Sequence, residues 1–308
     1  DGNGAIKVST KSGLYQLYAG QFLYPGTLEK DGSYRPIADK KIANLGLYQH
    51  QFVMIDDKAV LSNAWAGKLF SKHSLSDAYL LAGGKDFSFL ISNGSQLEYL
   101  PKEGTPWKES ISNGKVLDLK YDASSDLFYA LSENAVYSVS GKDKKLQKIY
   151  SANDLTCFEL FSGKIVVGTK NGYLELDKTG KIVTPIQQKL PCLELTCISV
   201  IDNQLWFGSA LGAFMRKSDG KFNYYASERW IPSDKVIHIA KGDENSVLIL
   251  TDKGVGKIIF TKMTLQEKAE FYDKQVRTRH IRNGFNGTLG HMKNGNLSTG
   301  RLQDSDND

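Results

Sequence analysis

The sequence predicts an all-β fold, a β-propeller of seven blades, with six or eight blades as the alternatives. A strand-and-turn pattern recurs seven times along the 308 residues: an apolar residue is followed, seven positions later, by Gly or Asn. A strand buried on one face and closed by a turn residue that tolerates positive φ has this pattern. The pairs are Ile6/Gly13, Val60/Gly67, Phe87/Gly94, Leu127/Asn134, Ile165/Gly172, Leu205/Gly212 and Val247/Gly254.

A gap-free internal repeat gives the content of one blade. Residues 154–181 align with residues 194–221 at an offset of 40 positions. Short antiparallel strands at this period predict propeller blades of four strands rather than helical repeats. In the first copy the predicted strands are Leu155–Leu160, Lys164–Thr169, Gly172–Leu176 and Ile182–Pro185.

The two ends of the repeat region are incomplete. The chain begins at a second strand, Ala5–Thr10, and the last blade, Val236–Phe260, shows three clear strands. A long insertion near residues 24–44 separates the first two blades. Because an unpaired strand edge needs a partner or a cover, we expect the segment Thr288–Leu302 to return, pair beside the N-terminal strand and help to close the ring.

Residues 261–308 form a separate C-terminal element after a propeller domain of residues 1–260. Thr264 and Glu267 have the spacing of a capping box, which begins a helix. The sequence therefore predicts an amphipathic helix over residues 264–282, followed by a tail. The apolar stripe of this helix consists of Leu265, Ala269, Tyr272, Val276 and His280.

Composition and charge limit the function classes. With 41% apolar and 24% charged residues, the chain can bury a large core. The longest apolar runs have the length of a strand, so no membrane span is predicted. The net charge of +5 is spread along the repeats, which argues against nucleic-acid binding. The chain has no Gly-x-Ser-x-Gly, Walker or His-Glu-x-x-His motif, and no cofactor is predicted.

Four residues at matching positions of neighbouring blades have metal-ligating side chains: Asp118, Cys157, Cys197 and His238. Packed strands of successive blades lie about 10 Å apart. This separation is too large for one ion, whose ligands stand at about 2.0–2.3 Å. We therefore predict buried side chains, no metal and no disulfide, with Cys192 as the third free thiol.

Blade geometry selects the residues that can meet a ligand. In a four-stranded blade, the turn between the second and third strands lies on the same face as the connection to the next blade. We place Trp65 in a turn of this kind, and Trp107, Arg229 and Trp230 in such connections. Because indole rings and guanidinium groups suit sugars and anions, these four are the predicted ligand-binding residues. The alternatives are core burial for Trp65 and a wedge between two blades for Trp230.

Arg277, Arg279 and Arg282 crowd the last turns of the predicted helix. One interpretation is that they complement the helix dipole or pair with acidic residues of the tail. The other is an anion site for a uronate or a sulfated glycan.

Three stretches resemble a known repeat. The sequences LWFGSALGAFMR (205–216), KIVVGTKNGYLEL (164–176) and IKVSTKSGLYQL (6–17) are similar to the two-component-regulator propeller repeat. The resemblance covers residues 1–260 and implies a sensor-type propeller outside the membrane, of the kind found in Bacteroidetes. The segments 225–236, 265–284 and 297–308 resemble an uncharacterised group of bacterial propeller proteins that continue into an all-helical toroid domain.

Two function classes follow from these observations. The first is a non-catalytic recognition or sensing propeller, periplasmic, cell-surface or secreted and monomeric, which binds a glycan or a partner protein on one face. The alternative is a carbohydrate-active enzyme, a polysaccharide lyase or hydrolase, or the propeller half of one. A lyase would need a Tyr or His base, for which His50 and His238 are the first candidates. We favour the first class, because a fold by itself does not confer chemistry.

Overall fold

A computed structural model describes residues 7–10, 13–18, 21–23, 26–28, 34–36, 43–48, 51–62, 69–112, 114–227, 229–242, 245–260, 264–267, 269–270, 273–274, 288–293 and 296–301. The chain divides into two compact units, residues 1–258 and residues 259–308.

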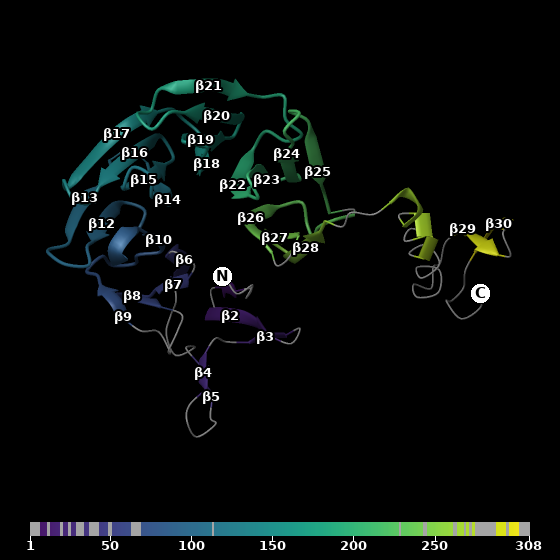
Figure 1. The fold of residues 1–308 in the computed structure, drawn as a ribbon, viewed down its shortest axis with the longest axis horizontal. Coiled ribbons are helices and arrows are strands. Elements are labelled where there is room, and N and C mark those ends of the chain that lie inside the picture. The colour runs from purple at the N-terminus through teal and green to yellow at the C-terminus, as the bar shows by residue number, and fades with distance from the viewer. Residues whose placement is uncertain are drawn as a thin grey trace. The chain divides into compact units, whose positions relative to one another are not determined.

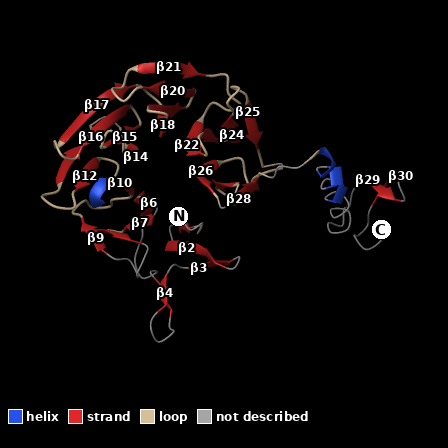
Figure 2. Ribbon diagram, viewed as in Figure 1, coloured by secondary structure: helices blue, strands red, loops and turns tan. Residues whose placement is uncertain are grey.

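The first unit consists of antiparallel sheets (Figures 1 and 2). Each four-stranded sheet is a meander in which consecutive strands pair. The four-stranded sheets of the described residues are β6 (Asn44–Tyr48), β7 (Gln51–Ile55), β8 (Ala59–Ser62) and β9 (Leu69–Lys72); β10 (Leu80–Gly83), β11 (Phe89–Ser92), β12 (Gln96–Leu100) and β13 (Trp107–Ser110); β14 (Val116–Asp122), β15 (Leu127–Ser132), β16 (Ala135–Ser140) and β17 (Lys145–Ser151); β18 (Leu155–Phe161), β19 (Lys164–Thr169), β20 (Gly172–Leu176) and β21 (Ile182–Gln187); and β22 (Leu195–Ile201), β23 (Gln204–Ser209), β24 (Gly212–Arg216) and β25 (Phe222–Tyr225). A short 3-10 helix, η1 (Lys85–Phe87), joins β10 to β11.

The first and last sheets have three described strands each, as the incomplete ends of the repeat predict. A two-stranded hairpin lies within the predicted insertion. The three-stranded sheets are β1 (Lys7–Thr10), β2 (Gly13–Tyr18) and β3 (Gln21–Leu23), and β26 (Val236–Lys241), β27 (Ser246–Thr251) and β28 (Gly254–Ile259); the hairpin is β4 (Gly26–Leu28) and β5 (Tyr34–Pro36).

The sheets are arranged as propeller blades. The first strands of consecutive sheets, β6, β10, β14, β18, β22 and β26, contact one another in that order. Apolar side chains fill the space between neighbouring sheets, for example Leu131, Phe158 and Leu174 between the β14–β17 and β18–β21 sheets. Four-stranded meanders whose first strands lie side by side form a β-propeller. The all-β propeller prediction is therefore confirmed, whereas the number of seven blades stays a prediction.

A buried hydroxyl explains the repeated strand-and-turn pattern. At the end of β19, Thr169 Oγ1 donates to Gly172 O and accepts from Asn171 N–H, both at 3.0 Å. The turn between the second and third strands is thus fixed by one side chain. Gly172 has φ +118°, and a Cβ there would stand 2.0 Å from Gln187 O, so glycine is required. The equivalent hydroxyls are Ser92, Ser132, Ser209 and Thr251.

The β6–β9 sheet departs from the predicted register. The pair Val60/Gly67 was expected to mark a second strand and its turn, but Val60 lies on β8, the third strand. The turn between the second and third strands is 56–58, where Asp56 Oδ1 accepts from the N–H groups of Lys58 and Ala59. An Asp-based turn needs no Gly at the marker position, which is why the sequence pattern misplaced this blade.

The second unit contains the start of a helix and a hairpin. Thr264 and Glu267 form the predicted capping box, because Glu267 N–H donates to Thr264 Oγ1 at 3.2 Å and Thr264 N–H donates to Glu267 Oε2 at 2.7 Å. Helical residues follow at 265–267, 269–270 and 273–274; the remainder of the predicted helix lies outside the described residues.

The tail contains a hairpin of its own. β29 (Thr288–Lys293) pairs with β30 (Asn296–Arg301) in an antiparallel hairpin. The described sheet that contains β1 holds only β1, β2 and β3. A local hairpin closes at a smaller entropic cost than a long-range pairing. The expected pairing of Thr288–Leu302 beside the N-terminal strand stays a prediction.

Candidate ligand-binding face

One face of the propeller carries two kinds of segment, and we call it face A. It is formed by the turns between second and third strands and by the connections that lead from each fourth strand to the next sheet. Backbone hydrogen bonds join the two kinds, for example from Gly172 N–H to Leu193 O at 3.0 Å and from Lys170 N–H to Asp154 O at 3.2 Å. The turns are 56–58, 93–95, 133–134, 170–171, 210–211 and 252–253, and the connections are 73–79, 111–115, 152–154, 188–194 and 226–235.

Arg229 and Trp230 lie on face A, as predicted. They belong to the connection 226–235, and the Trp230 side chain is 44% exposed. The Arg229 guanidinium stands 5.0 Å from the centre of the indole, and Tyr225 contacts the ring edge-on at 5.8 Å. Ile231, which is buried, packs against Gly256 of the next sheet. The wedge between the blades is thus formed by Ile231, and the Trp230 indole faces solvent.

Trp107 does not lie on face A, and its expected placement was wrong. It is the first residue of β13 and pairs with Tyr99, whereas Ser110, at the other end of β13, is next to face A. The Trp107 indole N–H donates to Gly141 O of the next sheet at 3.3 Å, and its ring contacts Tyr99 at 6.0 Å. The sequence placed Trp107 in a connection because Pro106 precedes it, but the strand begins directly after that proline.

Trp65, Arg277, Arg279 and Arg282 lie outside the described residues, and so does His50. Of the four predicted ligand-binding residues, the structure places Arg229 and Trp230 on face A and Trp107 on β13.

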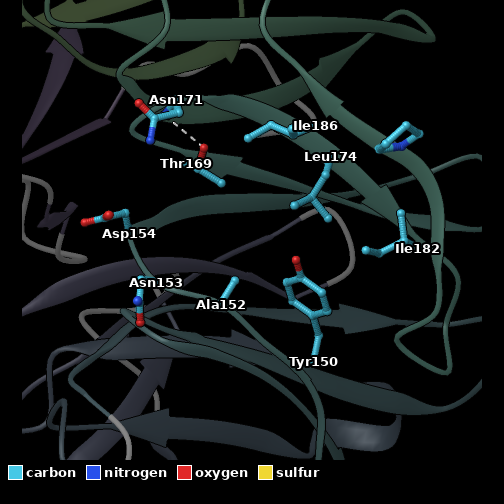
Figure 3. Close-up of a pocket in the computed structure, with 10 residues that line it drawn as sticks. Tyr150, Ala152, Asn153, Asp154, Thr169, Asn171, Leu174, Ile182 and Ile186 are labelled. Atoms are coloured by element: carbon cyan, nitrogen blue, oxygen red, sulfur yellow. Dashed lines mark hydrogen bonds between the residues drawn. The ribbon is translucent and has the colours of Figure 1, made fainter.

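A pocket of about 340 Å³ lies between the β14–β17 and β18–β21 sheets (Figure 3). One side of it is apolar, and the other is polar and formed by segments of face A. The apolar side consists of Tyr150, Leu174, Ile182, Pro185 and Ile186, and the polar side of Asn153, Asp154, Thr169 and Asn171. Leu174 is buried at the bottom, whereas Ile182 and Ile186 of β21 are 49% and 44% exposed.

Exposed apolar side chains continue from this pocket across face A. We call Ile186, Leu193, Leu211, Tyr224 and Trp230 the apolar band; each is between 41% and 64% exposed. Cys192 Sγ contacts Leu211 O at 3.8 Å, and the Tyr224 hydroxyl donates to the same carbonyl. These contacts join the connection 188–194, the turn 210–211 and strand β25 into one surface.

A second pocket, of about 470 Å³, lies between β9 and β13. Glu98 is its most buried group: the side chain is 2% exposed, accepts from Ser74 Oγ at 3.0 Å and lies 3.9 Å from Lys108 Nζ. Trp107 borders this pocket, but its ring packs on the other side of the sheet, with Tyr99. Charged and apolar side chains both line this pocket, among them Lys72, His73 and Pro106.

The first strands carry an ionic cluster. Lys120 Nζ of β14 lies 3.1 Å from Glu159 Oε2 of β18 and 3.6 Å from Asp118 Oδ2. Burial alone would lower the pKa of Lys120, but the two carboxylates reverse this effect and raise it. Burial and the Lys120 charge together lower the pKa of His238. At neutral pH Lys120 is therefore charged and His238 neutral.

Cys157 and Cys197 lie on the same strands and are buried, as predicted. Burial raises the pKa of both thiols, that of Cys197 to about 12. Because the thiolate is the nucleophile and the metal ligand, neither thiol is activated. In the described part of the chain, no group of three or more His, Cys, Asp and Glu side chains is placed to hold a metal ion.

Comparison with known proteins supports the fold. No family model and no curated protein match the chain. The extracellular domain of a one component system from B. thetaiotaomicron matches with a TM-score of 0.63 and 12% identity, over 85% of this chain and 38% of that one. The extracellular domain of a hybrid two component system from the same organism gives 0.63 and 15%, over 83% and 38%. The chain thus spans 38% of the length of these two structures.

A third match is an enzyme. The inactive variant of virginiamycin B lyase from Staphylococcus aureus, solved with quinupristin, has a TM-score of 0.59 and 12% identity, over 84% of this chain and 95% of that one. At such identities the likeness shows the fold alone. The class of this chain is therefore the β-propeller. No helix among the described residues is long and apolar enough to cross a membrane.

Sequence reasoning identified Arg229 and Trp230 but missed the pocket between β17 and β21. A signal was present: β21 reads IVTPIQ, with three branched aliphatic residues, whereas the outer strand β13 reads WKES and is polar after its first residue. Apolar residues on an outermost strand have no further strand of their own sheet to cover them, so they indicate a surface that serves another purpose.

Proposed function

We propose that this chain is a non-catalytic recognition or sensing propeller that acts outside the cytoplasm, in the periplasm or at the cell surface. It binds a macromolecular ligand, a glycan or a partner protein, on face A. The observation that carries this proposal is the apolar band together with the pocket beside it. The band extends over two sheets and the connections that follow them, and an exposed apolar surface of this kind is typical of an interaction site.

The residue types of the band support recognition. Trp, Tyr and Arg are the side chains that contribute most to binding at interfaces. Tyr224 lies on β25, and Arg229 and Trp230 lie on the connection that follows this strand. The similar extracellular domains of a one component system and a hybrid two component system from B. thetaiotaomicron support a location outside the cytoplasm.

The chemistry of the site favours binding over catalysis. The one carboxylate of the pocket, Asp154, pairs with Lys170 at 3.1 Å. Lys120, His238 and the buried thiols lie on the first strands, away from the pocket, and neither the lysine nor the thiols can act as a nucleophile in the protonation state that their surroundings impose.

The test is a binding screen of the purified chain against a glycan array and a peptide library, repeated with face A variants. Leu211→Asp and Trp230→Ala should each weaken binding of any confirmed ligand by about tenfold or more, because both side chains are central to the band. Leu69→Asp is the control, since Leu69 is 47% exposed but lies on β9 of another sheet. Equal effects of all three variants, or none, would contradict the proposal.

A further inference from the structure

The pocket between β17 and β21 indicates what kind of ligand face A binds. Resting on the proposed function, we propose that this pocket receives an aliphatic side chain of an extended polypeptide segment, so that the macromolecule bound by the chain is a protein.

The shape and lining of the pocket suit an aliphatic side chain. The side chains of Tyr150, Leu174, Ile182 and Ile186 lie around the same space (Figure 3), and Pro185 also lines the pocket. Leu174 is 5% exposed, so the pocket ends on a buried apolar surface. An aliphatic group that contacts these side chains removes apolar area from water, which is favourable by about 25 cal/mol per Å².

The polar side of the pocket suits the backbone of the same segment. Asn153 and Asn171 are exposed at the face A end, and within the described residues neither side-chain amide makes a hydrogen bond. A carboxamide has one acceptor and two donors, which match the N–H and C=O groups of a peptide. Asp154, already paired with Lys170, adds further acceptor positions.

A sugar ring fits this lining less well. Saccharide sites combine a flat aromatic face with polar groups for several hydroxyls. Here Tyr150 is the one aromatic side chain of the lining, and four branched or cyclic aliphatic residues stand where hydroxyl groups would need partners. A buried hydroxyl without a hydrogen-bond partner costs about 1–3 kcal/mol.

The segment is held by its side chain rather than by strand addition. β21 is the outer strand of its sheet, and its pairing with β20 shifts register twice, between Tyr173 and Glu175 and between Glu175 and Leu176. Pro185 also removes one N–H donor from β21. Irregular pairing and proline both prevent an edge strand from accepting another strand.

The segment continues along the apolar band. Leu193 and Leu211 lie next on this surface, and Arg229 stands over the Trp230 ring at its end. Lys189 is exposed in the connection 188–194 and has no ion-pair partner among the described residues. We therefore expect acidic residues beside the aliphatic one in the bound segment.

Two neighbouring residues of β21 provide a matched test. Ile182 and Val183 are both 49% exposed, but Ile182 lines the pocket and Val183 does not. A library of blocked random heptapeptides is selected on the immobilised chain, and the affinity of the selected peptides is measured by calorimetry. We expect one aliphatic position to be enriched, with acidic neighbours. Ile182→Asp should weaken binding about tenfold or more, and Val183→Asp by less than about twofold.

Each outcome decides between the two proposals. Melting temperatures of both variants close to that of the wild type show that the fold is kept, and Ile186→Asp serves instead if Ile182→Asp does not fold. Glycans whose binding depends on Leu211 and Ile182, with no peptide enriched, would overturn the polypeptide assignment and leave the proposed function intact. Enriched peptides whose affinity is unchanged in the Ile182→Asp and Ile186→Asp variants would also overturn it. If every face A variant bound its ligands as tightly as the wild type, both proposals would be overturned.

Discussion

At the residue scale, glycines of the second strands are paired with cysteines of the first strands. A Cβ on Gly168 would stand 2.5 Å from Cys157 Sγ, and one on Gly208 would stand 2.5 Å from Cys197 Sγ. The thiol of each first strand thus occupies the space that a side chain of the second strand would take. This packing accounts for the buried cysteines without any chemical role, and it explains the Gly-Thr and Gly-Ser pairs of the repeat.

Gly168→Ala should lower the free energy of unfolding by about 1–3 kcal/mol, because overpacking forces the neighbours to move. The double variant Gly168→Ala/Cys157→Ala should recover most of this loss, since the nearest remaining atoms, Ile198 Cδ1 and Leu195 Cβ, stand at 3.3 Å. Urea unfolding of the two single variants and the double variant measures the coupling. Additive losses would show that the thiol is not what requires glycine.

At the element scale, the turn between second and third strands is fixed by one hydroxyl in most sheets. Thr169→Val keeps the shape of the side chain but removes both hydrogen bonds, to Gly172 O and from Asn171 N–H. We expect a loss of about 1–2 kcal/mol, because Thr169 is 5% exposed and the freed groups are poorly hydrated. Thr169→Ser is the control and should cost less, since it keeps the hydroxyl. Chemical denaturation followed by tyrosine and tryptophan fluorescence measures both.

These turns explain how much of the fold could be predicted. Where a hydroxyl and a glycine fix the turn, as at Thr169 and Gly172, the local sequence determines the strands on both sides, and the predicted bounds were close. Where Asp56 fixes the turn instead, the pattern was read one strand out of place. The pairing of the tail is a different case: pairing over a long separation leaves no local signal, so the return of Thr288–Leu302 to the N-terminal strand stays a prediction.

The candidate site was predicted only in part for the same reason. Arg229 and Trp230 are found from chain connectivity, because a connection of ten residues must lie at the end of its sheet. The pocket is formed by residues from two sheets, such as Tyr150 and Ile186. The pocket exists only because neighbouring sheets stand far enough apart at this place. The spacing of residues within one sequence repeat contains no information about that distance.

At the scale of the whole molecule, polar contacts tie neighbouring sheets together in addition to the apolar cores. Ser199 Oγ donates to Ile239 O at 2.7 Å and Thr196 Oγ1 to Val236 O at 2.7 Å, both from β22 to β26. Lys120 and Glu159 join β14 to β18. Since each sheet otherwise contacts only its neighbours, such contacts determine how strongly unfolding of one blade is coupled to the next.

The contact between Lys178 and Asp122 makes this coupling depend on pH. Lys178 follows β20, and Asp122 ends β14 of the preceding sheet. Burial by itself would raise the pKa of Asp122, but hydrogen bonds from Lys178, Ser125 and Ser124 outweigh it and lower the pKa from 3.8 to about 2. The folded-state pKa therefore lies below the unfolded one. The resulting stability, about 2 kcal/mol, is fully present above about pH 4 and is lost as the pH falls through about 2.

Lys178→Met should thus destabilise the protein at neutral pH, and the difference from the wild type should shrink between about pH 4 and pH 2, because Asp122 is then protonated in both proteins. Lys170→Met is the matched control: its ion pair with Asp154 is exposed, with side chains 58% and 49% accessible, and such pairs contribute little. Thermal unfolding across this pH range measures all three proteins. The stability difference between Lys178→Met and the wild type could instead stay constant down to about pH 2. Lys178 would then act through packing of its alkyl chain, and the charge of Asp122 would not couple the two sheets.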